Sequence, residues 1–482
     1  MQLISFGFIL FWAIALSAYY MVPKFQWHIL LTTSLAFYML YADRIPVAMF
    51  VCAAVLWGFG HVVKVDGKNI FFRSVLLVHI MMLLCFKTSY LGLGLDVAVP
   101  VGASFFLLAS MGYCIDIHWK RYAPERNFAK LLLFLCFFPS VIQGPINRYD
   151  KLHKELFQKH SFQADSILMG IRRFIWGLFK KLILVDRLNA VTREVFGSIE
   201  SQSGIVIIFA VICFSIELYA DFSGYTDMVL GIGQTFGIMI PENFKRPYFS
   251  CTVAEFWRRW HISLGTWFRD YVMYGFVMSR SGKRIGREIK KKNKYWGKLV
   301  PALMGTMIVW ILTGLWHDMS GGYILWGIYY GVIICISLCT EEFWKQKKAK
   351  LKFFKTKVYH VVCVARTYLI VLLADLIICA GPGKLGLCLT KIFARGDVFD
   401  FQTLLHYIRT IPKTSIILII FGTIVMLLFS AFQEKYNSAG SAAPKFPAIL
   451  KWVFWYFMIV SVVLFGTYGV GYDTSTFMYQ SF

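Results

Sequence analysis

Two histidines carry the side chain best suited to moving a proton near neutral pH. His317 directly follows Leu299–Trp316, a run of 18 residues without a charged side chain, and His261 lies in an aromatic-rich segment. A neutral imidazole can take a proton from a hydroxyl group as that group attacks a carbonyl carbon. Because an ionisable side chain is costly at membrane depth unless it is paired or functional, His317 is the first candidate for a general base.

The segment around His261 has the pattern of an amphipathic helix that follows a loop bracketed by Pro241 and Pro247. Thr252 and Glu255 predict a helix start with a capping box. The spacing places His261 on the apolar face, where a hydrogen-bonded core role and a catalytic role both stay open, and the three tryptophans also fit an aromatic belt. That face repeats at intervals of three and four residues through Phe256, Trp257, Trp260, Leu264, Trp267, Phe268 and Tyr271.

Neither the histidines nor the cysteines predict a metal site. His261 and His317 are 56 positions apart, which fits no zinc-ligand spacing. The 11 cysteines lie mostly within apolar runs and form no CxxC pair, so they indicate small apolar side chains rather than a disulfide framework.

The elements that position these residues are membrane helices. Of 482 residues, 58% are hydrophobic and 16% are charged, with a mean hydropathy of +0.61. An ordinary globular chain has about 25% charged residues. This composition excludes a soluble enzyme, a disordered chain and a coiled coil, and it predicts an all-α, multi-pass membrane protein.

The apolar runs predict 11–13 helices, of which some are too short or too interrupted to be full spans. The first run, Leu3–Val22, has no basic segment before it, so we expect a retained span rather than a cleaved signal peptide. The other runs are Trp27–Ala42, Pro46–Val63, Ile70–Phe86, Pro100–Ile117, Phe128–Ile146, Ile167–Val185, Ile205–Tyr219, Phe222–Ile240, Leu299–Trp316, Tyr323–Leu338, Val358–Ala380, Ser415–Phe432 and Ile449–Val470.

The positive charge predicts topology rather than nucleic-acid binding. The net charge is +24, but no basic stretch belongs to a soluble domain. Two basic loops, Ser279–Lys298 and Lys345–Lys357, are separated by two apolar runs, so both are expected on the cytoplasmic side. The turn His317–Gly322 between those runs then points toward the other face of the membrane.

Carboxylates within apolar stretches allow two interpretations. They form a proton relay, as in a proton-coupled transporter or flippase, or they pair with basic residues such as Lys180, Lys181 and Arg187. A transporter would also predict inverted repeats, and no corresponding pair of broken segments is visible. The residues concerned are Glu217, Asp221, Asp227 and Asp375.

Several motifs, in the same order along the chain, closely resemble the membrane-bound O-acyltransferase (MBOAT) family, and most of all its bacterial alginate O-acetyltransferase branch. They are Pro100–Phe106, Gln143–Arg148, Gly177–Lys181, Asp221–Asp227, Pro241–Phe244, Glu255–Leu264, Trp267–Asp270, Gly314–His317 and the tail Phe477–Phe482. The resemblance therefore extends over nearly the whole chain.

The resemblance implies one integral-membrane domain over residues 1–482, with a motif-bearing core of about 100–340 and C-terminal helices over 358–482. It implies a ring of helices around a central funnel, with His317 as the catalytic histidine and His261 as the second motif histidine. The chain departs from its relatives after His317, at Asp318–Gly322, and near Asp375–Ala380, so no role is carried over to Asp375. The expected donor- or substrate-binding residues are Asn243, Trp257, Arg258, Arg259, Trp260 and Trp316.

The function implied is transfer of a short acyl group, expected to be acetyl, from a cytoplasmic thioester to an extracytoplasmic hydroxyl. His317 would be the base, and either protonated His261 or a tryptophan N–H would stabilise the oxyanion. The donor is expected to be acetyl-CoA or an acylated carrier protein, attracted by the basic surface of Arg258 and Arg259, with no tightly bound cofactor.

The expected acceptor is a cell-surface polysaccharide or a relay partner, such as an SGNH-type acetyltransferase or esterase-like protein, and the expected location is a bacterial inner membrane. D-alanyl transfer to teichoic acid, a transporter, and a scaffold for a separate transferase are the alternatives.

Overall fold

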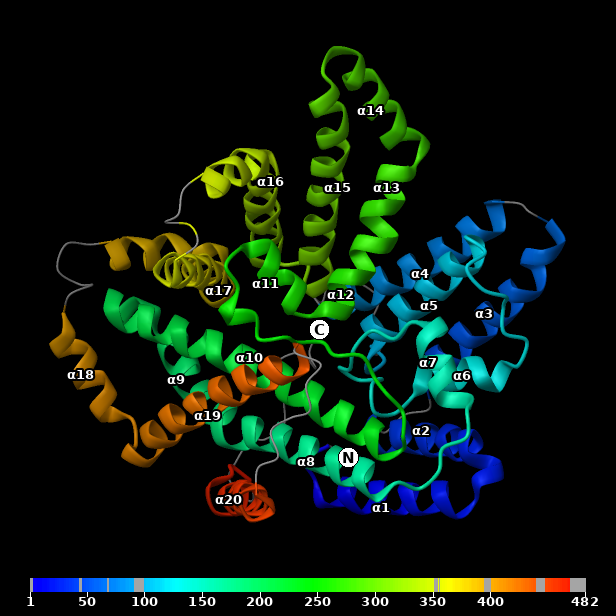
Figure 1. The fold of residues 1–482 in the computed structure, drawn as a ribbon, viewed down its shortest axis with the longest axis horizontal. Coiled ribbons are helices and arrows are strands. Elements are labelled where there is room, and N and C mark those ends of the chain that lie inside the picture. Colours follow the sequence, from blue (N-terminus) through cyan, green and yellow to red (C-terminus); the bar gives the residue numbers. More distant parts are fainter. Residues whose placement is uncertain are drawn as a thin grey trace. The chain divides into compact units, whose positions relative to one another are not determined.

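The apolar runs form helices because a helix satisfies its own backbone hydrogen bonds where no water is available. The computed structural model describes residues 3–42, 46–66, 69–90, 99–350, 354, 356–393, 400–438 and 447–468. Within these residues every regular element is a helix (Figure 1), which confirms the predicted all-α class. The tail motif Phe477–Phe482 lies outside the described residues.

Several of the apolar runs form short or bent helices rather than full spans, as expected. A further candidate span is the pair Phe6–Met21 and Pro23–Tyr41, which is bent by 105° at the break before Pro23. Three shorter apolar helices cover Val47–Val62, Ala103–His118 and Trp452–Phe465. The helices that are long and apolar enough to cross a membrane are Ile70–Lys87, Gly204–Thr235, Lys294–His317, Gly321–Lys347, Lys357–Phe393 and Lys413–Phe432.

The chain forms two compact units, and the first contains Met1–Leu178 and Phe222–Glu242. Its core is rich in buried aromatic side chains. Its complete elements are α1 (Phe6–Met21), η1 (Pro23–Phe25), α2 (Gln26–Ala42), α3 (Val47–Asp66), α4 (Asn69–Tyr90), α5 (Ala103–His118), α6 (Phe128–Cys136) and α7 (Tyr149–Phe157). Most of α8 (Ala164–Phe179) and the second part of α10 (Gly204–Thr235) also belong to it.

Two expectations about helix boundaries are wrong. The run Phe128–Ile146 is helical only to Cys136, and residues 137–147 form buried irregular backbone that contains Pro139 and Pro145. Proline lacks a backbone N–H and disfavours helix at the preceding residue, which explains the early end. The runs Ile205–Tyr219 and Phe222–Ile240, in contrast, are joined through residue 235 in the single helix α10.

The second unit contains Phe179–Asp221 and Asn243–Thr474, and it includes both candidate histidines. Its elements before the candidate site are η2 (Lys180–Val185, a π-helix), α9 (Asp186–Gly197), η3 (Ile199–Ser201) and the first part of α10. The elements around and after the site are η4 (Pro247–Phe249), α11 (Val253–Arg259), α12 (Ile262–Trp267), η5 (Phe268–Met273, a π-helix), α13 (Tyr274–Met278), α14 (Arg280–Lys292), α15 (Lys294–His317), α16 (Gly321–Lys350), α17 (Lys357–Phe393), α18 (Phe401–Thr410), α19 (Lys413–Ser438) and α20 (Ala448–Phe465).

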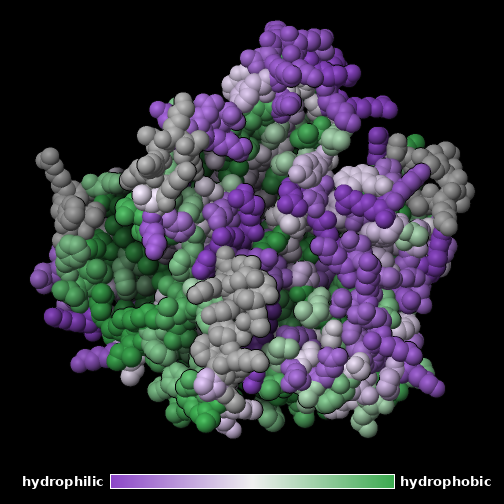
Figure 2. All heavy atoms as spheres, in the orientation of Figure 1, coloured by the Kyte–Doolittle hydropathy of each residue, from purple (hydrophilic) through white to green (hydrophobic). Residues whose placement is uncertain are grey.

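The expected basic loop at Ser279–Lys298 is largely the helix α14, followed by the start of α15. Ser279 caps α14 by accepting a hydrogen bond from the backbone N–H of Gly282 at 3.1 Å. The hydrophilic surface gathers over this helix (Figure 2). The exposed basic residues of α14 are Arg280, Lys283, Arg284, Arg287, Lys290, Lys291 and Lys292.

Candidate active site

His317 is the last residue of α15 and is buried. The helix ends there because Asp318 adopts an extended conformation, with φ −159° and ψ 147°. The imidazole is surrounded by aromatic rings, at centroid distances of 4.9 Å from Trp316, 5.8 Å from Tyr323 and 5.4 Å from Trp326. The candidate base therefore lies within a packed apolar cluster at the junction of α15 and α16.

Four aromatic residues from three helices form a cage beside His317. Trp257 of α11 contacts Trp310 of α15 at 4.7 Å, and it contacts Trp326 and Tyr330 of α16 at 5.4 Å and 4.9 Å. We call Trp257, Trp310, Trp326 and Tyr330 the aromatic cage. Nε1 of Trp257 is buried and donates no hydrogen bond to the described part of the chain.

The predicted continuous helix from Thr252 to Tyr271 is wrong at His261. Its start is confirmed, since the Thr252 side chain accepts from the backbone N–H of Glu255 at 3.1 Å. The helix breaks after Arg259, and His261 precedes α12 in the left-handed conformation, with φ 43° and ψ 53°. The break removes His261 from the helical face that its spacing predicts.

A preceding loop holds His261 at this break. The backbone N–H of Lys245 donates to the carbonyl oxygen of Arg259 at 2.8 Å, and that of Ile262 donates to Asn243 at 3.0 Å. The side-chain oxygen of Asn243 accepts from the backbone N–H and the hydroxyl of Ser263 at 3.0 and 2.9 Å. Asn243 therefore fixes the backbone on the C-terminal side of His261.

The same asparagine also contacts the ring of His261. Oδ1 of Asn243 lies 3.4 Å from Nδ1 of His261, which favours the tautomer with its proton on Nδ1 and leaves Nε2 as an acceptor. Burial lowers the pKa of His261 to about 3. Of the two expected oxyanion donors, protonated His261 and a tryptophan N–H, the lowered pKa favours the tryptophan N–H.

Trp316 links the two histidines in space. Its ring lies 6.0 Å from that of His261 and 4.9 Å from that of His317. The structure thus brings together the two predicted catalytic histidines, although they are 56 positions apart in the sequence.

The other predicted binding residues have separate surroundings. Arg258 is exposed, and the guanidinium group of Arg259 pairs with Glu255 at 2.7 Å. Trp260 is buried among aromatic rings, with centroids 5.1 Å from Phe244 and 5.5 Å from Phe256. Its contacts support the loop before His261 rather than the aromatic cage.

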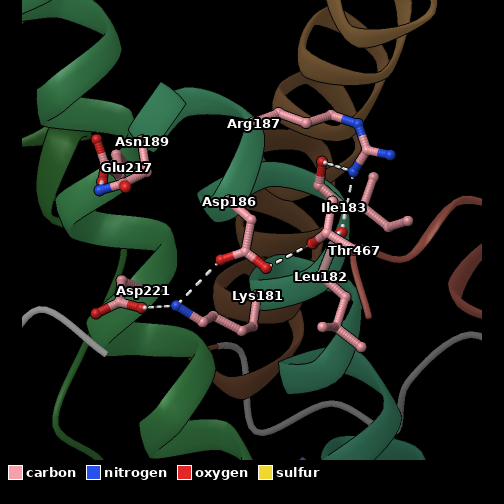
Figure 3. A network of polar contacts seen from close by, with 9 residues as sticks. All are labelled: Lys181, Leu182, Ile183, Asp186, Arg187, Asn189, Glu217, Asp221 and Thr467. Atoms are coloured by element: carbon pink, nitrogen blue, oxygen red, sulfur yellow. Dashed lines mark hydrogen bonds and ion pairs between the residues drawn. The ribbon is translucent and has the colours of Figure 1, made fainter. Parts of the chain in front are cut away.

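Of the four carboxylates within apolar stretches, Asp221 and Asp227 form ion pairs, and Glu217 accepts hydrogen bonds from uncharged groups. Asp221 pairs with Lys181 at 3.3 Å, and Lys181 also pairs with Asp186 at 3.2 Å (Figure 3). This contact confirms the pairing alternative for Asp221. Arg173 pairs with Asp227 at 2.9 Å. The fourth carboxylate, Asp375, is considered below.

Glu217 and Arg187 bind to uncharged groups. The carboxylate of Glu217 accepts from the amide of Asn189, which lies beside it in Figure 3, at 2.7 Å. It also accepts from the hydroxyl of Thr192 at 2.8 Å. Arg187 donates to the carbonyl oxygen atoms of Leu182 and Ile183 at 3.0 and 3.1 Å. Among the described residues no three His, Cys, Asp or Glu side chains gather to hold a metal ion.

The sequence analysis assigned no site role to Trp310, Trp326 or Tyr330. The sequence feature that could have located these three residues is a glycine in each helix, Gly314 in α15 and Gly327 in α16, at the contact between the two helices. A Cβ atom on Gly314 would lie 2.4 Å from the carbonyl oxygen of Tyr323, and one on Gly327 would lie 2.5 Å from that of Trp310. Such close backbone packing brings the aromatic side chains of both helices to one place.

Comparison with known proteins identifies the region that carries this site. Residues 121–288 match the model of the membrane-bound O-acyltransferase family. The matched region includes His261 and ends before His317. A probable alginate O-acetylase of Pseudomonas syringae is 34% identical over 240 residues, or 50% of this chain and 43% of the relative.

The names of two further relatives refer to other acceptors, peptidoglycan and teichoic acid. A peptidoglycan O-acetyltransferase of Helicobacter pylori is 28% identical over 268 residues, covering 50% of this chain and 48% of the relative. A teichoic acid D-alanyltransferase of Bacillus subtilis is 29% identical over 250 residues, covering 51% and 60%. The chain thus spans about half the length of the relatives it matches. The matched family region and these similarities show that about half of the chain resembles proteins of the membrane-bound O-acyltransferase family.

Proposed function

We propose that this chain is a membrane O-acyltransferase that moves a short acyl group, expected to be acetyl, from a cytoplasmic thioester to an extracytoplasmic hydroxyl. The observation that carries the proposal is the convergence of His261 and His317 on Trp316, inside one buried cluster. The names of the relatives support O-acyl transfer as the reaction class.

His317 would act as the general base. The acceptor hydroxyl attacks the thioester carbonyl carbon, a C–O bond forms as the C–S bond breaks, and the hydroxyl proton passes through the imidazole to the leaving thiolate. General-base assistance contributes typically 10²–10⁴-fold to the rate. His261 would orient the hydroxyl through the acceptor atom Nε2.

The negative charge on the carbonyl oxygen needs a hydrogen-bond donor. Nε1 of Trp257 and Nδ2 of Asn243 are buried and donate no hydrogen bond to the described residues. A hydrogen-bond donor aimed at the developing charge raises kcat by about 10²–10³-fold. These two groups therefore replace a protonated His261 as the candidates for this role.

The names of the relatives support the proposed acceptor class, and the donor class is an expectation from the resemblance. We propose a cell-surface polysaccharide, or a relay protein that passes the acetyl group on, as the acceptor, and acetyl-CoA or an acylated carrier protein as the donor. D-alanyl transfer from a carrier protein is the second candidate, because the Bacillus subtilis relative has that name. A proton-coupled transporter is less favoured, since three of its four relay carboxylates have local partners.

Membrane vesicles that contain the full chain provide the test. With radiolabelled acetyl-CoA and the native polymer, we expect transfer in the wild type and a loss of at least 10²-fold in His317→Ala. His406→Ala is the matched control, because His406 is an exposed histidine on α18. Retained transfer in an inserted His317→Ala variant would remove His317 from this role, and transfer only from a D-alanyl carrier protein would favour the second candidate.

A further inference from the structure

The strained backbone at His261 needs an explanation. A histidine with φ 43° occupies the left-handed region, which side chains other than glycine rarely adopt. Arg246, in the loop that pairs with this segment, is also left-handed, with φ 47°. Such conformations persist only where the surrounding structure fixes them, and they gather at functional sites.

One anchor of this loop is the hydroxyl group of Tyr248, two residues after Arg246. It donates to the backbone carbonyl oxygen of Ser215 at 2.5 Å and accepts from the Ser215 hydroxyl at 3.0 Å. Ser215 lies on α10 and is fully buried. The double hydrogen bond therefore attaches the loop to a long helix.

Asp375 of α17 is buried, and its Oδ2 atom has no hydrogen bond to the described residues. Tyr368, also on α17, packs against Tyr248 with ring centroids 5.2 Å apart. Tyr248 is thus held between α10 and α17.

The ring of Tyr248 carries this anchoring toward His261. Its centroid lies 6.1 Å from that of Phe256 and 6.2 Å from that of Trp260, and Phe256 and Trp260 stack on each other at 5.5 Å. Trp260 directly precedes His261 in the chain. Displacement of the tyrosine would therefore act on the strained residue through one packed neighbour.

We propose that Tyr248, held by Ser215 and packed against Tyr368, is a positioning residue that keeps His261 beside Trp316. This inference rests on the proposed function, in which His261 orients the acceptor. Tyr248 itself contacts neither the His261 ring nor the His317 ring among the contacts of the described residues, so its effect on the reaction passes through the loop.

The test is a double-mutant cycle in the full chain, reconstituted in vesicles with labelled acetyl-CoA. We expect Tyr248→Phe to lower kcat about tenfold or more, with the KM for the donor unchanged, because small misplacements at a reacting centre are costly. Ser215→Ala should lower kcat less than Tyr248→Phe does, because it keeps the backbone oxygen that accepts from Tyr248. In a His261→Ala background, Tyr248→Phe should change the residual rate less than twofold. Tyr407→Phe is the matched control, since it removes a buried tyrosine hydroxyl that contacts Glu194 instead.

Hydrogen exchange of the backbone amides gives a second readout that needs no activity. We expect faster exchange at Lys245, Ile262 and Ser263 in Tyr248→Phe and unchanged exchange there in Tyr407→Phe. The positioning role would be overturned if Tyr248→Phe lowered kcat by the same factor in the wild-type and His261→Ala backgrounds. Unchanged amide exchange in this loop would overturn it as well. A wild type without any transfer would instead refute the proposed function and leave the exchange result standing.

Discussion

The two histidines reach the same indole by different routes. His317 arrives at the end of the long helix α15, whose axis fixes its position, while His261 depends on a break between two short helices. Full burial lowers the pKa of His261, and the contact with Asn243 favours the tautomer with its proton on Nδ1. A neutral His261 leaves Nε2 as an acceptor, which fits the orienting role that we propose for it beside the proposed base His317.

The pKa of His261 predicts a pH-dependent loss of stability. An unfolded imidazole takes up a proton below pH 6.5, but the folded one does so only near pH 3. Because the unfolded state binds more protons in this window, stability falls as the pH falls from 6.5 toward 3. At pH 4.5 the expected cost is about 2–3 kcal/mol.

The measurement compares thermal unfolding midpoints in detergent at pH 7 and pH 4.5. The wild type should lose more stability on acidification than His261→Asn, which cannot take up this proton. His406→Asn, altered at an exposed histidine, should follow the wild type. Parallel pH curves for wild type and His261→Asn would contradict the burial argument.

At the residue scale, sequence patterns select candidate side chains, but they do not predict how those side chains are held. The residue type and the apolar run before it are enough to select His317. The helical spacing around His261 predicts a face that the fold does not use, because hydrogen bonds to Asn243 and Lys245, distant in sequence, override local propensity. No local pattern contains those long-range bonds.

At the scale of elements, the contact between α15 and α16 decides where His317 lies. Gly314 and Gly327 allow the two backbones to approach closely, and Trp310 and Trp326 pack beside them at 6.0 Å. The aromatic cage is thus a consequence of a glycine-mediated helix contact. Runs of apolar residues predict both helices, but they do not specify which faces meet.

Gly314→Ala should therefore disturb both stability and the site. The added Cβ would lie 2.4 Å from the backbone oxygen of Tyr323, so the helices must separate. Overpacking of this kind typically costs about 1–3 kcal/mol. We expect a lower unfolding midpoint in detergent and slower acyl transfer.

Gly275→Ala is the matched control, because a Cβ at that helical position meets no atom within 4 Å. It should be neutral or slightly stabilising, as expected for Gly→Ala in a helix. Equal midpoints for wild type and Gly314→Ala would contradict the tight backbone contact between α15 and α16.

At the scale of the whole molecule, the distribution of charge predicts how the chain is oriented in the bilayer. The basic helix α14 precedes α15, and a second basic segment follows the apolar part of α16. Basic segments favour the cytoplasmic side. The 24 residues of α15 correspond to about 36 Å of helix, which is enough to cross the hydrocarbon core.

Thiol labelling in intact cells and in inverted vesicles tests this orientation. In a chain with the exposed Cys339 changed to serine, single cysteines at Arg287 and Lys347 should react with a membrane-impermeant maleimide only in inverted vesicles. A cysteine at Ser320, in the turn after His317, should react only from outside. If Arg287→Cys and Ser320→Cys were labelled from the same side, α15 would not span the membrane, and donor and acceptor could not reach His317 from opposite compartments.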